Sequence, residues 1–296
     1  MFEYETGTDT WLSRTQVADT LGDGSSRETT SSGGVLSYPG SGDYLYCIPR
    51  SGLETMYRYD INTQQWEALS DLPITTSGYS LAIVNAGKPW FFIFNERWGN
   101  YFMRYYPSEE KFDLPSFLPA DMNEDCAFSG YKNYIYYLNR QSLYLYNTQY
   151  NTWSQLSDPP ISFSASGPAM HIVESQGQLG LYVTGGDGSN LFYKYSTADD
   201  AWSSLSSPSQ NFEAGNVFCE KGGDLYVLRG QSNTFWKYDV AEDSWEDLAN
   251  TPQYINWGSQ IVYPGSGDYL YILTGNHTSS FYRYHIPSNT WSSRAQ

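Results

Sequence analysis

The sequence predicts an all-β protein, a β-propeller of four-stranded blades, on the strength of three observations. Aromatic residues make up 18% of the 296 residues, and glycine is abundant with 26 copies. Aromatic residues favour strands, whereas glycine favours the turns between them. A tyrosine followed seven positions later by tryptophan or phenylalanine recurs seven times. An apolar hairpin pattern precedes six of these seven pairs.

The aromatic pair marks the outer hairpin of each repeat. The residues between its two members read as turns, for example at 60–65 and 239–244. Because such a turn places positions i and i+7 opposite one another, each tyrosine can contact its partner across the hairpin. Successive pairs are separated by about 40–50 residues, the range expected for a propeller blade. The pairs are Tyr4/Trp11, Tyr59/Trp66, Tyr105/Phe112, Tyr146/Trp153, Tyr195/Trp202, Tyr238/Trp245 and Tyr284/Trp291.

A second hairpin upstream of the aromatic pair supplies two inner strands. The octapeptide Pro-Gly-Ser-Gly-Asp-Tyr-Leu-Tyr is identical at 39–46 and 264–271, within this hairpin. Four-stranded sheets repeated radially bury their faces against neighbouring sheets, so we expect a single domain over 1–296. The expected inner strands are 34–38 with 44–48, 81–84 with 91–94, 127–128 with 135–138, 170–173 with 181–184, 217–219 with 225–228, and 259–263 with 269–273.

Residues 1–12 contain an aromatic pair but no inner hairpin. We favour seven blades, the first of which is incomplete in this chain and takes its inner strands from beyond an end. The alternative is a six-bladed propeller with residues 1–12 as an accessory N-terminal hairpin. Residues 13–32 are rich in Ser, Thr and Gly and are interpreted as a linker, and residues 33–296 as six complete units.

The spaced Tyr and Trp resemble the Kelch repeat, in which apolar strand residues and a diglycine precede the pair. The diglycine is complete once, at Gly185-Gly186, and half present at Arg229-Gly230 and Thr274-Gly275. It is absent at 49–50, 95–96 and 139–140. The resemblance covers nearly the whole chain and implies a Kelch-type β-propeller. Such propellers serve as lectin-like, scaffold and enzyme modules, so the fold alone does not define the function.

Charge and composition exclude several classes of partner. The formal net charge is −16, with 16 Lys plus Arg and no basic cluster, which argues against nucleic acid and anionic membranes. No apolar stretch approaches the roughly 20 residues that span a bilayer, so we expect no direct membrane insertion. Residues 1–5 do not resemble a signal peptide, yet the acidic, lysine-poor composition favours an extracellular or cell-surface location. Cys47, Cys126 and Cys219 lie in apolar runs and are expected to be buried thiols.

The Kelch resemblance also indicates where a ligand would bind. It implies a face built by the loops that follow the second strand and the loops that enter the first strand. Aromatic planes stack on sugar rings, while carboxylates, amides and Arg bind hydroxyl or acidic groups. We therefore predict a non-enzymatic recognition or structural module that binds carbohydrate or protein. The predicted ligand-binding residues are Arg50, Arg97, Trp98, Arg140, Asp187, Glu213, Tyr254, Trp257 and His277.

Two alternatives remain open. One is a sugar-modifying enzyme resembling the Kelch-fold sialic acid mutarotases. In it Arg50, Arg140 or Arg229 would hold a carboxylate, and Glu96, Glu213 or His277 would transfer protons. The other is a structural subunit in which residues 1–12 add strands to another copy of the chain, giving a homo-oligomer.

No metal or cofactor is expected. His171, His277 and His285 occupy three different places in the repeat, and no His-x-x-x-His or Cys-x-x-Cys spacing occurs. The loop around Asp187 carries too few carboxylates for calcium. The two His, two Tyr and Tyr-linked Cys of Kelch-fold copper-radical oxidases cannot be placed in this chain.

Overall fold

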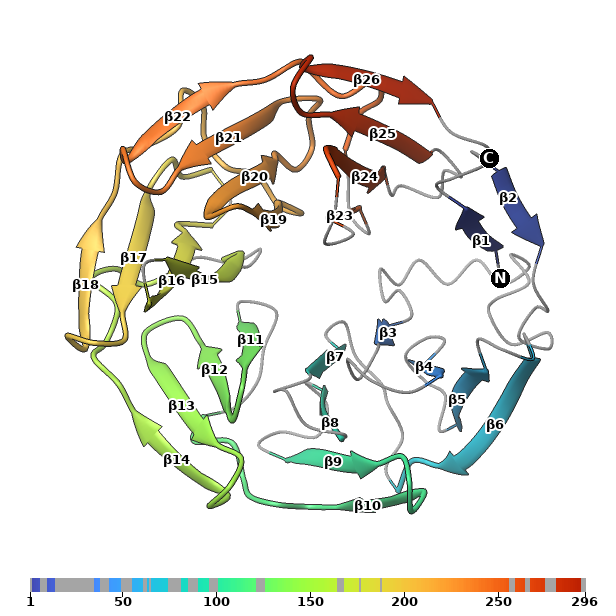
Figure 1. The fold of residues 1–296 in the computed structure, drawn as a ribbon. Helices are drawn as coiled ribbons and strands as arrows, with labels where there is room; N and C mark the ends of the chain where they lie inside the picture. The colour runs from blue at the N-terminus through green and yellow to red at the C-terminus, as the bar shows by residue number, and fades with distance from the viewer. Residues whose placement is uncertain are drawn as a thin grey trace. The chain divides into compact units, whose positions relative to one another are not determined.

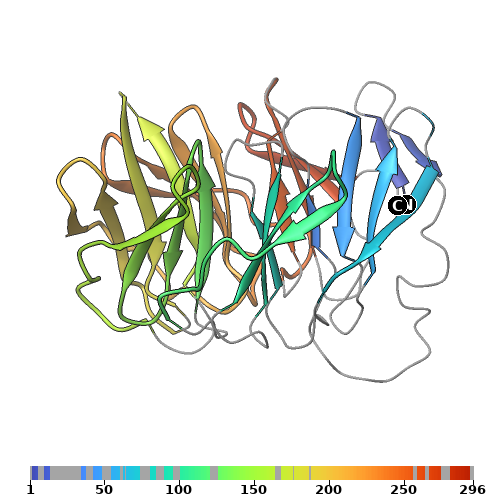
Figure 2. The same cartoon turned by 90° about the horizontal axis from the view of Figure 1, so that it is seen from below.

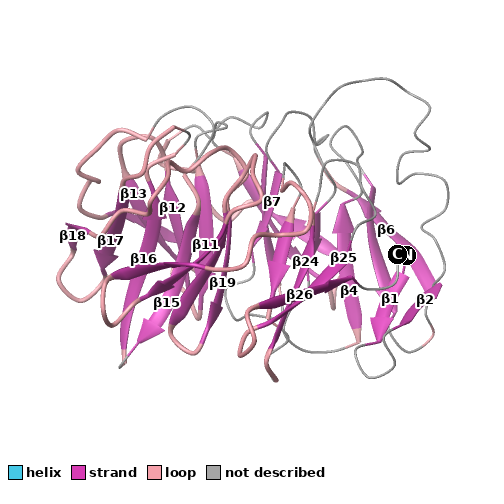
Figure 3. Cartoon of the chain, turned by 90° about the horizontal axis from the view of Figure 1, so that it is seen from above, coloured by secondary structure: helices cyan, strands magenta, loops and turns pink. Residues whose placement is uncertain are grey.

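The computed structural model describes strands and loops and no helix (Figure 3). No helix that could cross a bilayer occurs in the described part of the chain. The chain divides into two compact units, unit 1 (Met1–Glu3 and Leu12–Leu156) and unit 2 (Tyr4–Trp11 and Ser157–Gln296). The described residues are 2–5, 10–13, 35–37, 43–48, 55–60, 63, 65–73, 81–84, 90–95, 101–120, 126–163, 168–175, 177–186, 188–255, 259–263, 267–274 and 281–293.

Unit 1 contains four-stranded antiparallel sheets, each formed by strands that follow one another along the chain (Figure 1). Every strand pairs with the next, so each sheet is a pair of hairpins as predicted. The strands are β3 (Val35–Ser37), β4 (Tyr44–Ile48), β5 (Thr55–Asp60) and β6 (Gln65–Asp71); β7 (Leu81–Val84), β8 (Phe91–Asn95), β9 (Phe102–Tyr106) and β10 (Lys111–Asp113); and β11 (Ala127–Tyr131), β12 (Tyr134–Leu138), β13 (Leu143–Asn147) and β14 (Thr152–Gln155).

Unit 2 repeats this arrangement. In the sheet β15–β18, the strands run up and down in the view of Figure 2, so the connecting turns lie at two opposite ends. The strands are β15 (Met170–Ser175), β16 (Gln178–Thr184), β17 (Phe192–Ser196) and β18 (Ala201–Ser204); β19 (Val217–Lys221), β20 (Asp224–Leu228), β21 (Phe235–Asp239) and β22 (Ser244–Asp247); and β23 (Gln260–Val262), β24 (Tyr269–Leu273), β25 (Phe281–His285) and β26 (Thr290–Ser293).

The N-terminal aromatic pair lies in a sheet of two strands, β1 (Phe2–Glu5) and β2 (Thr10–Ser13). The predicted hairpin at residues 1–12 is therefore present, as a pair of strands. The choice between seven blades and six blades with an accessory hairpin stays a prediction, as does the docking of this hairpin on another copy. Most of the predicted linker lies outside the described residues.

The predicted pairing of the aromatic residues is confirmed in the six four-stranded sheets. Each Tyr is the direct cross-strand partner of its Trp or Phe, from Tyr59 with Trp66 to Tyr284 with Trp291. The ring centroids are 4.9 Å apart in Tyr146/Trp153 and 5.0 Å apart in Tyr238/Trp245. At such distances aromatic pairs attract beyond their simple burial.

Within each unit, neighbouring sheets share a hydrophobic core. Phe94 and Phe102 from β8 and β9 pack with Tyr137 and Tyr146 of the next sheet. In unit 2, a second core brings together residues of β15–β17 and β19–β21, including the fully buried Trp236. Each large apolar side chain buried in this way contributes about 1.5–3 kcal/mol. One sheet therefore depends on its neighbour for burial, as the repeat predicts.

A set of hydrogen bonds at the outer turns, here called the outer-turn link, joins the aromatic pair to the preceding segment in four of the described sheets. Its centre is an Asn or Asp with left-handed backbone, at φ 48° in Asp200, 47° in Asp243 and 51° in Asn289. This side chain accepts the tyrosine hydroxyl of its own hairpin, as in Tyr238 to Asp243 at 2.7 Å. The corresponding bonds are Tyr146 to Asn151, Tyr195 to Asp200 and Tyr284 to Asn289.

The same link reaches backward along the chain in unit 2. Asp243 Oδ1 also accepts the backbone N–H of Ser206 at 2.8 Å, and Trp245 Nε1 donates to the carbonyl of Ser206 at 2.6 Å. The tryptophan is therefore hydrogen-bonded directly to one residue of the preceding segment. The tyrosine is connected to the same residue through the Asp of the turn. The same bonds join Asp200 and Trp202 to Ser157, and Asn289 and Trp291 to Ala249.

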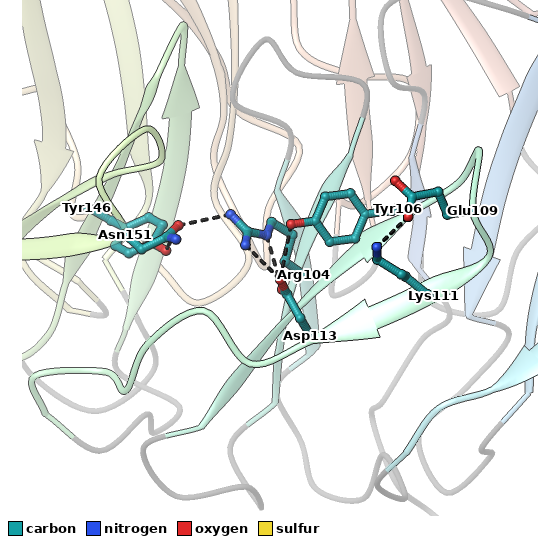
Figure 4. Close-up of polar contacts among 7 residues, drawn as sticks. All are labelled: Arg104, Tyr106, Glu109, Lys111, Asp113, Tyr146 and Asn151. Carbon is teal, nitrogen blue, oxygen red and sulfur yellow. Dashed lines mark hydrogen bonds and ion pairs between the residues drawn. The ribbon is translucent and has the colours of Figure 1, made fainter.

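Unit 1 forms its link with arginine instead of a backbone amide (Figure 4). Arg104 Nη1 donates to Asn151 Oδ1 at 2.9 Å, beside the hydroxyl of Tyr146. The rest of its guanidinium is held by both oxygens of Asp113, at 3.0 and 2.7 Å. Arg58 reaches Glu110 in the same way, at 3.0 Å, and Glu110 also has left-handed backbone. In unit 1 an arginine side chain therefore contacts the turn residue, whereas in unit 2 a backbone N–H group does so.

The outer-turn link predicts the effect of replacing Asp243. Asp243→Gly should lower the free energy of unfolding by about 1–3 kcal/mol, because the buried hydroxyl of Tyr238 loses its acceptor. Glycine tolerates the left-handed backbone, so the loss reports on the side chain rather than on strain. Asp243→Asn is the control, since asparagine occupies this position at Asn151 and Asn289. Urea unfolding followed by tryptophan fluorescence measures both, and equal losses would contradict the prediction.

Candidate functional site

The two loop sets predicted to form the ligand face lie against each other in the structure. A backbone bridge joins Ser189, after β16, to Phe212, before β19. A second joins Ser232, after β20, to Ile255, before β23, and Ile255 N donates to Ser232 O at 2.6 Å. We call residues 188–191, 211–216, 229–234 and 251–255 the loop edge of unit 2. Unit 1 has an equivalent bridge, Tyr101 with Phe117.

Gly230, the one glycine of the half diglycine Arg229-Gly230, is required by the packing at this edge. A Cβ on Gly230 would lie 2.1 Å from the carbonyl oxygen of Ala214, so no side chain fits there. Gly230 N donates to Asn216 Oδ1 at 3.1 Å. The glycine therefore permits the close approach of two loops, which a repeat signature alone does not reveal.

Glu213 and Arg229 form the central ion pair of the loop edge. Arg229 Nη2 donates to Glu213 Oε1 at 2.7 Å, and its Nε donates to the carbonyl of Asn211 at 2.5 Å. The side chains are 13% exposed for Arg229 and 30% exposed for Glu213. The pair joins the end of one strand to the entry of another and neutralises both charges. The predicted ligand-binding Glu213 is thus held by a cation of the protein itself.

Tyr254 presents the largest exposed aromatic surface of the loop edge, at 58%. Its neighbour Ile255 is fully buried, and Thr251 is 3% exposed. Thr251 donates its backbone N–H to the carbonyl of Asn233 at 2.8 Å, and its hydroxyl to the carbonyl of Gln253 at 2.7 Å. An exposed ring is therefore mounted on a backbone anchored on both sides, an arrangement suited to binding without large ordering costs.

Of the other predicted ligand-binding residues, the structure describes only Arg140. Arg140 is exposed in the turn between β12 and β13 of unit 1. Arg50, Arg97, Trp98, Asp187, Trp257 and His277 lie outside the described residues, as does Glu96 of the enzyme alternative. The structure thus brings Glu213 together with Arg229 and places Tyr254 on the same edge of unit 2. The exposed Gln253 and Asn211, which the sequence did not single out, lie beside them.

Burial shifts the pKa values of His171 and Cys219 in unit 2. Desolvation lowers the pKa of His171 on β15, against a smaller opposing effect of Glu220, so this imidazole is neutral at pH 7. Its ring lies 6.5 Å from that of Phe218. Burial raises the pKa of the Cys219 thiol to about 11, as expected for an unreactive core cysteine. Cys126 was predicted to be buried but is half-buried, since it lies immediately before β11, where the loop enters the sheet.

The described residues contain no group of three His, Cys, Asp or Glu side chains placed to hold a metal ion. The two charged side chains of the loop edge, Glu213 and Arg229, pair with each other, and His171 lies on strand β15. The arrangement supplies an exposed ring, amides and a neutralised ion pair, which suits the recognition of a polar, uncharged surface.

Comparison with known proteins supports the fold. No family model matches the chain, and no curated protein matches it in sequence. The chain is similar to the solved structure of YjhT, with a TM-score of 0.63 and 12% sequence identity. The match covers 90% of this chain and 97% of that one. Together with the four-stranded antiparallel sheets, this likeness shows an all-β fold of the β-propeller class, as predicted.

The depressed pKa of His171 predicts a pH dependence of stability. The unfolded chain takes up a proton near the ordinary histidine pKa of about 6.5, whereas the folded chain does so at lower pH. The contribution of the neutral imidazole is therefore present above about pH 6.5 and lost as pH falls through the folded pKa. The melting temperature should fall less between pH 7 and pH 5 in His171→Gln than in the natural protein. Equally steep profiles in calorimetry would show the prediction to be wrong.

Proposed function

We propose that the protein is a non-enzymatic recognition module that binds carbohydrate through the loop edge of unit 2, at a cell surface or outside the cell. The observation that carries the proposal is the exposed ring of Tyr254, held between the buried residues Thr251 and Ile255. A planar ring fixed in this way stacks on the C–H face of a sugar without a large loss of side-chain entropy.

The surroundings of Tyr254 supply the polar partners that a sugar needs. Gln253 and Asn211 are exposed on the same edge, and Asn211 Nδ2 donates to the carbonyl of Gly188 at 2.9 Å. That bond orients the amide and leaves its oxygen to accept a hydroxyl. Ligand sites commonly combine an aromatic surface with a few oriented polar groups, and this edge does so.

The ion pair favours recognition over the sugar-modifying alternative. An enzyme of that kind needs an arginine for the substrate carboxylate and a carboxylate for proton transfer. Arg229 is held by Glu213 at 2.7 Å and by the carbonyl of Asn211, so an acidic substrate would first have to displace Glu213. A neutral glycan imposes no such cost.

Replacing Tyr254 tests the proposal. In a glycan array followed by titration calorimetry of the best ligand, Tyr254→Ala should bind about 5- to 30-fold more weakly, because one stacked ring contributes roughly 1–2 kcal/mol. Tyr150→Ala is the matched control, since Tyr150 is 68% exposed in an outer turn of unit 1. It should bind as the unmodified protein does.

Four results would contradict the proposal. One is the absence of any glycan ligand on the array, and another is equal weakening by both substitutions. Retained glycan binding by Tyr254→Ala would place the carbohydrate site elsewhere. A protein partner captured through Tyr254, without glycan binding, would replace carbohydrate recognition with protein recognition.

A further inference from the structure

A cation recurs at one place in the third strand of the sheets. It lies between two aromatic or apolar residues that face the core, as in Tyr193-Lys194-Tyr195. Its direct partner on the second strand is aromatic, for example Tyr226 opposite Lys237. Only the sheet β11–β14 has an apolar residue, Leu145, at this place among the described sheets. The cations are Arg58, Arg104, Lys194, Lys237 and Arg283.

In four of these sheets the cation is neutralised or covered by its own sheet. A carboxylate accepts it in three, Arg58 with Glu67, Arg104 with Asp113 and Lys237 with Asp224, at 2.7–2.8 Å. An aromatic ring covers it in the fourth, with the Arg283 guanidinium 3.9 Å from the ring centroid of Tyr269. Tyr44 covers Arg58 in addition, at 4.8 Å.

Lys194 has neither a carboxylate nor an aromatic ring at the positions that provide these partners in the other four sheets. The register places Ser203 opposite it on β18, where Arg58 has Glu67. The residue two positions before its partner Tyr182 is Gly180, where other sheets carry Tyr44, Asp224 or Tyr269. Among the described residues Lys194 forms no ion pair, and its ammonium lies 5.7 Å from the ring centroid of Tyr182.

The missing side chain leaves a pocket of about 250 Å³ in unit 2. A Cβ on Gly180 would lie 2.8 Å from Lys194 Cε, so the lysine stem extends over the glycine. Val173 and Tyr182, each 2% exposed, form the apolar part, and Ser175 and Gln178 provide polar groups. Val240 from the β21–β22 turn lines the opposite side.

This pocket is separate from the loop edge. It lies where β15 turns into β16 and where β21 turns into β22, whereas the loop edge lies where β16 and β20 end. In antiparallel sheets these are opposite ends of the strands. Ligand binding here therefore does not depend on the proposed carbohydrate site.

We propose that the pocket binds a small molecule that carries one carboxylate on a flat apolar body. The carboxylate pairs with Lys194 as Asp224 pairs with Lys237, and the apolar body lies in the pocket against Val173, Tyr182 and Val240, beside the lysine stem. The ligand thus supplies the two partners that this sheet lacks. Benzoate has this composition and suits a pocket of about 250 Å³.

Two carboxylates close in sequence to the lining residues Val240 and Ala241 are engaged in hydrogen bonds. Asp243 Oδ1 accepts the hydroxyl of Tyr238 and the N–H of Ser206. Asp239 Oδ1 accepts the backbone N–H groups of Ala241 and Glu242. Their hydrogen bonds keep both side chains in the turn, so the charge of Lys194 remains available to a ligand.

Calorimetric titration of the full chain with benzoate tests the proposal, with benzamide as the neutral isostere. Benzoate should bind and benzamide should not. Lys194→Met and Gly180→Asp should each weaken benzoate binding at least about tenfold, the first by removing the cation and the second by pairing with it internally. Lys111→Met is the control and should bind normally, because Lys111 is an exposed residue of unit 1 that pairs with Glu109.

Equal binding of benzoate and benzamide would overturn the proposal, as would unchanged binding by Lys194→Met. Binding of inorganic phosphate in place of benzoate would overturn the carboxylate assignment. Should Gly180→Asp fail to fold, Lys194→Met decides the result, since methionine keeps the stem and its melting temperature reports on folding. Tyr254→Ala should leave benzoate binding intact, which separates this test from that of the carbohydrate site.

Discussion

A hydrogen bond from an outer-hairpin tyrosine to an Asn or Asp with left-handed backbone anchors four of the described sheets. The tyrosine ring lies in the core, so its hydroxyl needs an acceptor, and the turn residue provides one. The same acceptor takes a backbone N–H from the preceding segment in unit 2, or an arginine in unit 1. Burial within one sheet is thereby coupled to the position of the segment before it.

Because these bonds lie in the outer turns, the side chains of the loops and of the inner strand ends can differ between sheets. The outer turns carry the structural bonds, so the loop edge of unit 2 can present Tyr254 and a neutralised ion pair without loss of the fold. The same holds for Gly180, which departs from the repeat at a place where no outer-turn bond is made. Departures from the repeat are therefore the places where we propose that ligands bind.

Sequence reasoning recovered the strands well because their signals are local. The aromatic pairs and inner hairpins were placed correctly, with differences only at the ends. The strand predicted at 127–128 extends over Ala127–Tyr131, and that predicted at 181–184 begins at Gln178. In both cases polar or small residues beyond the apolar run still pair in the ladder, because a tight turn joins the two strands. Apolar pattern alone underestimates such strands.

The sequence by itself determined the fold class, the registers of the aromatic hairpins and the pairs of loop sets, since each rests on residues a few positions apart. Only the tertiary structure decided that Glu213 is paired with Arg229 and that Lys194 has no carboxylate partner among the described residues. These outcomes depend on which side chains from different loops and strands come within about 3 Å, and no local pattern encodes that distance. The function of the chain is therefore argued from contacts between strands, whereas its architecture follows from repetition along them.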